Sequence, residues 1–220
     1  TLTDVPSYSG IVFYQSDALY AYLSDGSSTV QKCRVTPDGQ LENHHCADSG
    51  AVPIFLNCPM YITFQTFNQV NYAYIANGDF HIGASVIQCR VENNGDFTHC
   101  QDSGAGAHLN GAADVDFALI AGKTYAYITQ PGGSIAKCDV DQHDGLFSHC
   151  ASANIDVNKP IGMTFKTIAN QLYAYIVDGG FGDSTAHTVL QCAVDLSGLL
   201  DCVDLGVRDV FSNTFGIAMF

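Results

Sequence analysis

One short motif occurs four times in this chain of 220 residues: Tyr-Ala-Tyr followed by leucine or isoleucine. The copies begin at Tyr20, Tyr72, Tyr125 and Tyr173, so they are separated by 52, 53 and 48 residues. A repeat of about 50 residues without helical periodicity is typical of β-propeller blades or a related β array. The repeat therefore predicts an all-β fold built from four similar units.

Each unit divides into four short predicted strands, which we call a to d. In the second unit they cover residues 60–67, 72–76, 85–91 and 96–101. The Tyr-Ala-Tyr strand b is apolar on both sides of its alternation, which suits a strand buried on both faces. Glycine beside asparagine or aspartate recurs between the strands and supplies the positive-φ positions of tight hairpins. This pattern predicts a four-bladed β-propeller, with a five-bladed propeller containing an incomplete blade as the alternative.

We expect a single propeller domain over residues 1–220. The predicted repeats are, approximately, 10–52, 60–106, 112–156 and 161–207, with 214–220 as a closing strand.

The last segment, Phe-Gly-Ile-Ala-Met-Phe at residues 215–220, is a fifth candidate for strand a. It is wholly apolar, and an exposed apolar strand promotes association. We expect it to be buried against the first unit as a clasp between the chain ends. A partial fifth blade and insertion into a second molecule are the alternatives.

The repeat resembles the lactonase-like "YVTN" class of β-propeller repeats. Three predicted strands carry the resemblance. The first has small and apolar residues, Gly162-Met163-Thr164-Phe165. The second is rich in aromatic residues and ends in an Asp turn, Leu172-Tyr173-Ala174-Tyr175-Ile176-Val177-Asp178, and the third contains branched residues, Thr188-Val189-Leu190-Gln191-Cys192. The paired cysteines depart from the commoner repeat. The resemblance implies a propeller but no particular function, because such repeats serve enzymes and binding scaffolds alike.

Eight of the nine cysteines form pairs centred on the glycine of a predicted c–d turn. Residues opposed across antiparallel strands have Cα atoms about 4.5–5.5 Å apart, which a disulfide can bridge. We therefore predict four disulfides within blades: Cys33–Cys46, Cys89–Cys100, Cys138–Cys150 and Cys192–Cys202. The ninth cysteine, Cys58, is left over by this pairing. We expect it to be buried and to pack as a small apolar residue, with an intermolecular disulfide as the alternative. Paired cysteines predict a secreted protein or another oxidising compartment.

A histidine precedes a cysteine three times, at His45, His99 and His149, which raises a metal site as the rival hypothesis. Neighbours on a strand point to opposite faces, so one ion cannot easily bind both side chains. The sequence also contains no Cys-x-x-Cys pair. We expect these histidines to be exposed polar residues of an outer strand.

Asp114 and Asp116 stand in strand a of the third unit, where the second unit has Tyr61 and Thr63. Strand a is predicted to be innermost, beside the channel, where two carboxylates are costly unless they are solvated, hydrogen-bonded or bound to a cation. Calcium or magnesium in the channel is one hypothesis. Hydrogen bonding to channel water or to backbone amides is the favoured one.

The b–c loops differ most between units and are the other candidate binding region. With Asp114, the candidate ligand-binding residues are His81 in the loop at 77–84 and Asp183 and His187 in the loop at 178–187. Plain divergence of loops is the alternative. The Asp-Ser-Gly sequences at 48–50 and 102–104 recur after strand d and indicate turns, and the chain has no Gly-x-Ser-x-Gly, His-Glu-x-x-His or P-loop motif.

The chain is acidic, with 8 Lys and Arg against 22 Asp and Glu and a net charge of −14. This balance argues against a nucleic-acid binder, and no apolar run approaches the ~18 residues of a membrane span. Three classes of function remain: a secreted, lectin-like binding protein for carbohydrate or protein, a lactonase-like or other hydrolytic enzyme with a channel cation, and a structural or storage protein. The sequence favours the first, as a monomer or weak dimer, with no catalytic residues assigned.

Overall fold

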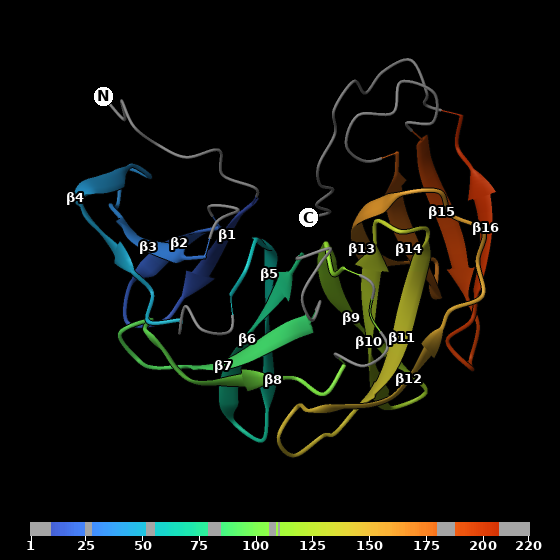
Figure 1. Cartoon of the computed structure of the whole chain (residues 1–220), viewed down its shortest axis with the longest axis horizontal. Helices are drawn as coiled ribbons and strands as arrows, with labels where there is room; N and C mark the ends of the chain where they lie inside the picture. Colours follow the sequence, from blue (N-terminus) through green and yellow to red (C-terminus); the bar gives the residue numbers. More distant parts are fainter. Residues whose placement is uncertain are drawn as a thin grey trace.

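The computed structural model describes residues 10–24, 28–51, 56–78, 85–105, 109, 111–179 and 188–206, without the side chains of 43–45 and 85. These residues form four antiparallel four-stranded sheets, each with its strands in chain order. The protein is a four-bladed β-propeller, as the repeat predicts (Figure 1). Within the described ranges, no helix is long and apolar enough to cross a membrane.

Every blade runs from an inner to an outer strand. The strands are β1 (Gly10–Gln15), β2 (Leu19–Ser24), β3 (Val30–Val35) and β4 (Leu41–Asp48) in the first blade; β5 (Pro59–Phe67), β6 (Val70–Asn77), β7 (Ser85–Val91) and β8 (Phe97–Asp102) in the second; β9 (Asp114–Ile120), β10 (Lys123–Gln130), β11 (Ser134–Val140) and β12 (Phe147–Ser152) in the third; and β13 (Pro160–Ile168), β14 (Gln171–Asp178), β15 (Thr188–Val194) and β16 (Leu200–Asp204) in the fourth.

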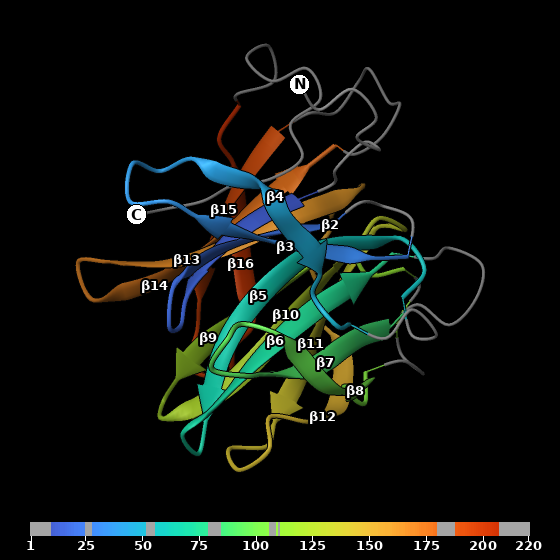
Figure 2. The same cartoon turned by 90° about the vertical axis from the view of Figure 1, so that its left-hand side faces the viewer.

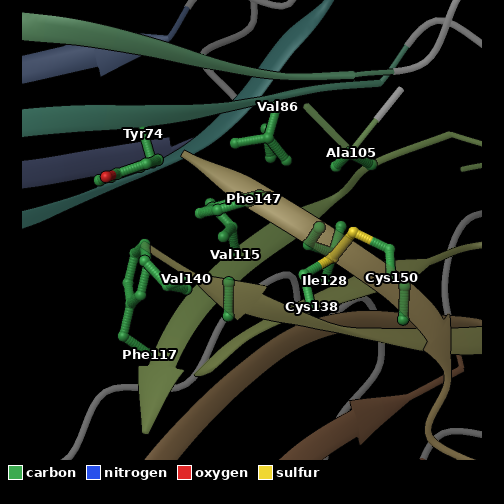
Figure 3. Packing of buried hydrophobic residues seen from close by; sticks show 14 of the residues in the cluster. Tyr74, Val86, Ala105, Val115, Phe117, Ile128, Cys138, Val140, Phe147 and Cys150 are labelled. Atoms are coloured by element: carbon green, nitrogen blue, oxygen red, sulfur yellow. A yellow bond between two sulfur atoms is a disulfide. The ribbon is translucent and has the colours of Figure 1, made fainter. Parts of the chain in front are cut away.

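The inner strands bring successive blades together: β1 contacts β5, β5 contacts β9, and β9 contacts β13. Figure 1 labels all four inner strands, and Figure 2 shows β5, β9 and β13 from the side. The second strand of each blade ends in a run of buried residues, which confirms that it is covered on both faces. The core therefore lies between blades. Figure 3 shows one such cluster, in which Tyr74 and Val86 of the second blade pack against Val115, Phe117 and Phe147 of the third.

One hydrogen bond recurs at three junctions between blades. It runs from the hydroxyl of the second Tyr in each Tyr-Ala-Tyr motif to the carbonyl of the turn glycine in the next blade: Tyr22 to Gly95 at 2.6 Å, Tyr74 to Gly145 at 2.9 Å and Tyr127 to Gly198 at 2.6 Å. Gly95 has φ of +78°, and a Cβ there would lie within 3.0 Å of the Tyr22 hydroxyl. Glycine is required for both the turn and the close approach.

A second donor strengthens each of these contacts. A long polar side chain of the third strand donates to the carbonyl just before the turn glycine: Lys32 Nζ to Asn94 O, Gln88 Nε2 to Asp144 O and Lys137 Nζ to Ser197 O. We call the tyrosine and this Lys or Gln the donor half of an interblade latch, and the two-residue turn its acceptor half. An aromatic ring also stacks on the tyrosine in two latches, with centroids 4.8 Å apart for Phe97 on Tyr22 and 5.3 Å apart for Phe147 on Tyr74.

The Asp-Ser-Gly sequences form turns at the ends of the outer strands, as expected. The amide of Gly50 donates to Asp48 Oδ1 at 2.8 Å, and the amide of Gly104 donates to Asp102 Oδ1 at 2.7 Å. The carbonyl of Ser49 accepts from the amide of Phe97 in the next blade at 2.7 Å. These serines therefore belong to blade junctions rather than to a nucleophilic site.

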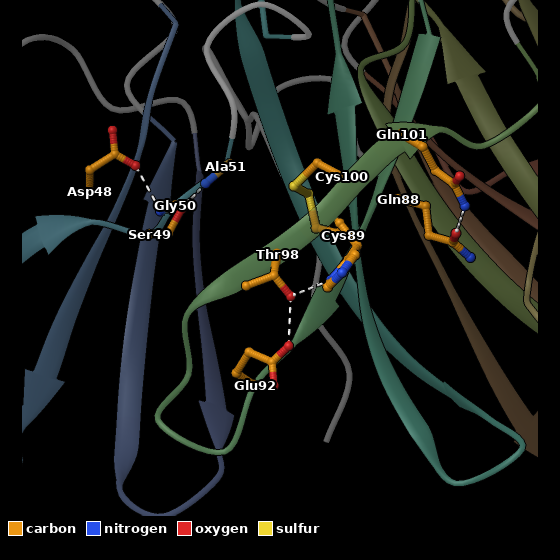
Figure 4. Close-up of a disulfide and its surroundings, with 11 residues drawn as sticks. Asp48, Ser49, Gly50, Ala51, Gln88, Cys89, Glu92, Thr98, Cys100 and Gln101 are labelled. Atoms are coloured by element: carbon orange, nitrogen blue, oxygen red, sulfur yellow. Dashed lines mark hydrogen bonds between the residues drawn. A yellow bond between two sulfur atoms is a disulfide. The ribbon is translucent and has the colours of Figure 1, made fainter.

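The four predicted disulfides are present, each within one blade, with Cα atoms 3.8–4.1 Å apart. Figure 4 shows Cys89–Cys100 bridging β7 and β8. The ladder shifts register at Cys89 and at Cys138. The residue before each partner cysteine has left-handed backbone, with φ of 49° at His99 and 48° at His149. In these two blades the histidine before the cysteine is therefore the extra residue of a β-bulge.

His99 and His149 are exposed, which confirms the interpretation of the sequence, whereas the side chain of His45 lies outside the described residues. Within the described ranges, no group of three or more His, Cys, Asp or Glu side chains could hold a metal ion.

The interblade latch can be tested with a matched pair of variants. Tyr22→Phe leaves the Gly95 carbonyl without its donor, which costs about 1–3 kcal/mol for a buried group. In a chain of this size that lowers the Tm by roughly 2–10 °C in differential scanning calorimetry. Tyr175→Phe is the control, because this hydroxyl accepts from Gln191 of its own blade, and we expect a smaller loss. Equal losses in the two variants would contradict the importance of the latch.

The disulfides can be tested by removing one pair. Replacing both Cys192 and Cys202 with Ala opens a loop with a sequence separation of 10, which we expect to cost about 2–3 kcal/mol of unfolding free energy. The Tm should fall by roughly 5–10 °C. Non-reducing peptide mapping of the unaltered chain should recover only links within blades, and a link between two blades would refute the pairing. Cys58→Ala should leave that map unchanged.

Candidate functional site

The candidate site is centred on Asp114 and Asp116, which lie on the inner strand β9. One residue separates them, so both side chains are on the same face of the strand. Both keep a small exposed fraction while protein surrounds them on most sides. They are polar exceptions on a strand whose alternate residues, Val115 and Phe117, belong to the buried core.

Asp114 links the third blade to the fourth. Its Oδ2 accepts a hydrogen bond from the amide of Met163 on β13 at 2.8 Å, and its Oδ1 accepts from the amide of Val115 at 2.8 Å. Its own amide donates to Thr129 Oγ1 at 3.0 Å. Both carboxyl oxygens are therefore occupied by a backbone amide, and one of these bonds crosses between blades.

Asp116 has similar surroundings. Its Oδ1 accepts from the amide of Phe117 at 2.8 Å. The backbone of Phe165 and the side chain of Thr164, both on β13, also hydrogen-bond to this carboxyl group. Bonding to backbone amides, the favoured hypothesis for the pair, is thus what the structure contains. A channel cation bound by the two carboxylates stays a prediction.

Burial changes the acidity of both groups. It raises the pKa of Asp114 from 3.8 to about 7, against the opposing hydrogen bond from Met163, and the negative charge of Asp116 adds to the rise. Burial likewise raises the pKa of Asp116 to about 6, although the amides of Phe117 and Phe165 and the side chain of Thr164 oppose it. At neutral pH Asp114 is therefore partly protonated and Asp116 mostly ionised, whereas exposed aspartates would both be fully ionised.

Tyr61 of β5 completes the site. Burial raises the pKa of its phenol, and the negative charge of Asp114 raises it further, so the hydroxyl stays neutral at physiological pH. Residues from three consecutive blades thus act on the carboxyl pair: β13 donates hydrogen bonds to it, and Tyr61 of β5 interacts electrostatically with Asp114. Tyr61 was not among the site residues predicted from the sequence, although its position in the second unit is the one that Asp114 occupies in the third.

Three of the predicted ligand-binding residues, His81, Asp183 and His187, lie outside the described residues. Their role in ligand binding stays a prediction.

Cys58 lies immediately before β5 and takes no part in the four disulfides. Its sulfur is 3.9 Å from the sulfur of Met60, and its backbone is left-handed with φ of 65°. The side chain is partly buried, not fully buried as expected, because it sits in the turn that enters the strand.

Comparisons with known proteins find similarity of fold only. No protein family model and no curated protein matches the chain. The chain is similar to a solved structure described as xyloglucan PUL GH43B of Bacteroides ovatus, with 18% identity and a TM-score of 0.58, covering 92% of this chain and 41% of that one. It is also similar to a family 43 arabinoxylan arabinofuranohydrolase from Bacillus subtilis, solved with cellotetraose. That match has 12% identity, a TM-score of 0.54, and coverage of 93% of this chain and 53% of that one.

A third solved structure is an engineered family 43 glycoside hydrolase with endo-xylanase and exo-arabinofuranosidase activity. It matches with 13% identity and a TM-score of 0.50, covering 92% of this chain and 42% of that one. The chain thus spans about half or less of the length of these structures. At such identities the likeness shows the propeller fold alone.

The raised pKa values predict how stability depends on pH. Between about pH 4 and pH 7 the folded chain holds protons on Asp114 and Asp116 that the unfolded chain has released, so the unfolding free energy falls as pH rises through this window. In Asp114→Asn this decline of Tm between pH 4.5 and pH 8 should be visibly shallower. Asp201→Asn, on the exposed side of β16, is the control and should follow the unaltered chain. Parallel Tm curves for Asp114→Asn and the unaltered chain would refute the shift.

Proposed function

We propose that this chain is a secreted, disulfide-stabilised β-propeller that binds carbohydrate through the site around Asp114, Asp116 and Tyr61. The observation that carries the proposal is the carboxyl pair on an inner strand. Groups of the next blade donate hydrogen bonds to it, and Tyr61 of the preceding blade interacts electrostatically with Asp114. Polar groups that converge from several elements and have perturbed pKa values are candidates for a ligand site.

The chemistry of the pair suits sugar hydroxyls. Each carboxylate oxygen can accept two hydrogen bonds. An oxygen of Asp114 that already accepts one amide bond therefore keeps capacity for a hydroxyl donor. A tyrosine contributes an apolar ring and a polar tip, which matches the mixed surface of a sugar.

Two further observations support the proposal. The solved structures of similar fold are glycoside hydrolases. Their descriptions name xyloglucan, arabinoxylan, or endo-xylanase and exo-arabinofuranosidase activity, so fragments of xyloglucan and arabinoxylan are the first ligands to test. Four disulfides suit a protein that works in an oxidising compartment, such as the extracellular space.

A hydrolytic enzyme is the second candidate, and the pKa of Asp114 favours it. A carboxyl group with a pKa of about 7 is a suitable general acid at neutral pH. Glycoside hydrolysis uses a pair of carboxyl groups around the scissile bond. The lactonase-like alternative, with a cation held by Asp114 and Asp116, belongs to the same class and requires a bound metal.

Carbohydrate binding is tested on an array that includes xyloglucan and arabinoxylan fragments. Loss of a hydrogen bond to a charged group costs about 1.5–3 kcal/mol, so Asp114→Asn and Asp116→Asn should each weaken binding about tenfold or more. Asp201→Asn should bind like the unaltered chain. His81→Ala, Asp183→Ala and His187→Ala, in the variable loops, should weaken binding further if the ligand extends to them.

The same samples separate the other candidates. Release of sugars from the bound fragments, abolished by Asp114→Asn, would assign the enzyme. A stoichiometric Ca or Mg in metal analysis would assign the cation site. A chain that binds no glycan and releases no product, with its disulfides and Tm intact, would refute carbohydrate binding and leave a structural or storage role.

A further inference from the structure

Every blade carries both halves of the interblade latch. The donor halves are Tyr22 with Lys32, Tyr74 with Gln88, Tyr127 with Lys137 and Tyr175 with Gln191; the acceptor halves are Asp38-Gly39, Asn94-Gly95, Asp144-Gly145 and Ser197-Gly198. Three donor halves bind the acceptor half of the next blade. The fourth does not: the Tyr175 hydroxyl accepts instead from Gln191 Nε2 at 2.7 Å, and a Cβ at Gly39 would meet nothing within 4 Å.

Among the described residues, two faces carry the latch halves that remain unbound: the face of the fourth blade with Tyr175 and the face of the first blade with Gly39. Apolar side chains are exposed on both faces. On the fourth blade, Ile168 is 44% exposed, whereas the residues at the same position of the second and third blades, Phe67 and Ile120, are each 5% exposed. On the first blade, Phe13 is 54% exposed, whereas its counterpart Phe117 is 9% exposed. The outward faces of the first and fourth blades therefore expose apolar surface of the kind that is buried wherever two successive blades pack together.

The chain contains a segment suited to the face of the fourth blade. An inner strand starts 11, 12 or 8 residues after the preceding outer strand ends, at residues 48 and 59, 102 and 114, and 152 and 160. The last outer strand ends at Asp204, and the apolar segment 215–220 begins 11 residues later. Its sequence Gly-Ile-Ala-Met-Phe at 216–220 has the same pattern as Gly-Ile-Val-Phe-Tyr at 10–14 in β1. Residues 207–220 lie outside the described residues.

We propose that residues 215–220 form a further inner strand that packs on the fourth blade beside β13, as β13 itself packs on the third blade. In each internal junction a phenylalanine of the arriving inner strand packs on the latch tyrosine: Phe64 with Tyr22 at 5.2 Å, Phe117 with Tyr74 at 4.7 Å and Phe165 with Tyr127 at 5.0 Å between ring centroids. Met219 occupies that position in the segment. It packs on the ring of Tyr175, and its thioether makes a favourable sulfur–aromatic contact there.

This placement differs from a clasp on the first blade. At each internal junction the new inner strand contacts the inner strand of the blade that precedes it in the chain. The segment is also joined to the fourth blade through a short connection, so its effective concentration at that face exceeds that of a second copy. Its apolar residues cover part of the face that includes Ile168 and Tyr175.

A double-mutant cycle on the full chain tests the contact. Met219→Ala and Tyr175→Ala should each lower the Tm by a few degrees, and the double variant should lose less than the sum of the two. The control cycle pairs Met219→Ala with Phe13→Ala, and here the losses should add. Coupling to Phe13 in place of Tyr175 would assign the clasp and overturn the proposal. Coupling that disappears on dilution, together with dimers in native mass spectrometry, would assign a second copy and also overturn it.

A reporter that does not depend on stability complements the cycle. The chain has no tryptophan, so a single one introduced at 219 or 218 reports only its own surroundings. Met219→Trp should be shielded from acrylamide quenching, because that side chain faces the fourth blade. Ala218→Trp, which points to the opposite side of the same strand, should be quenched more strongly. Equal quenching at the two positions would refute the strand.

Discussion

The hydrogen bond from a buried tyrosine hydroxyl to a turn glycine of the next blade is the contact on which the propeller depends. Tyr22, Tyr74 and Tyr127 are fully buried, and a buried hydroxyl needs a partner. The left-handed glycine turn presents a carbonyl to it without a side chain in the way. Each bond joins residues 71 to 73 apart in sequence. Blade packing is therefore specified by a polar contact of fixed position, while the surrounding apolar residues supply most of the burial.

The sequence was sufficient to predict the blades because hairpin geometry is local. The turn glycine fixes the centre of each c–d hairpin, and cysteines placed evenly about it face each other across the strands. The bulges were not predicted, although the cysteine spacing of the second blade contains a signal of one. The unbulged pair in the fourth blade has a separation of 10, whereas Cys89 and Cys100 are 11 apart, with His99 as the additional residue. In the second blade this odd difference reflects the one residue inserted into the outer strand. The third blade gives no such signal, because Cys138 and Cys150 are 12 apart: besides the bulge at His149, its turn is one residue longer, with Val140 paired to Phe147.

The candidate site was predicted only in part, because its contacts are not local. The interruption of an apolar inner strand was enough to select Asp114 and Asp116, and the cost of burying charge indicated that channel water or backbone amides would hydrogen-bond to them. The amide that binds Asp114 Oδ2 belongs to Met163, 49 residues further along the chain. Tyr61 comes from the preceding blade. Only the packing of β5, β9 and β13 brings these residues together, and no periodicity within one repeat specifies it.

The site and the blade junction share an atom, which constrains the ligands that can bind. A group that displaced the Met163 amide from Asp114 would remove a bond between the third and fourth blades. A hydroxyl that donates to the remaining acceptor capacity of the same carboxylate leaves that bond intact. The proposed site would therefore favour a ligand whose hydroxyl groups add to the carboxyl pair over one that replaces its backbone partners.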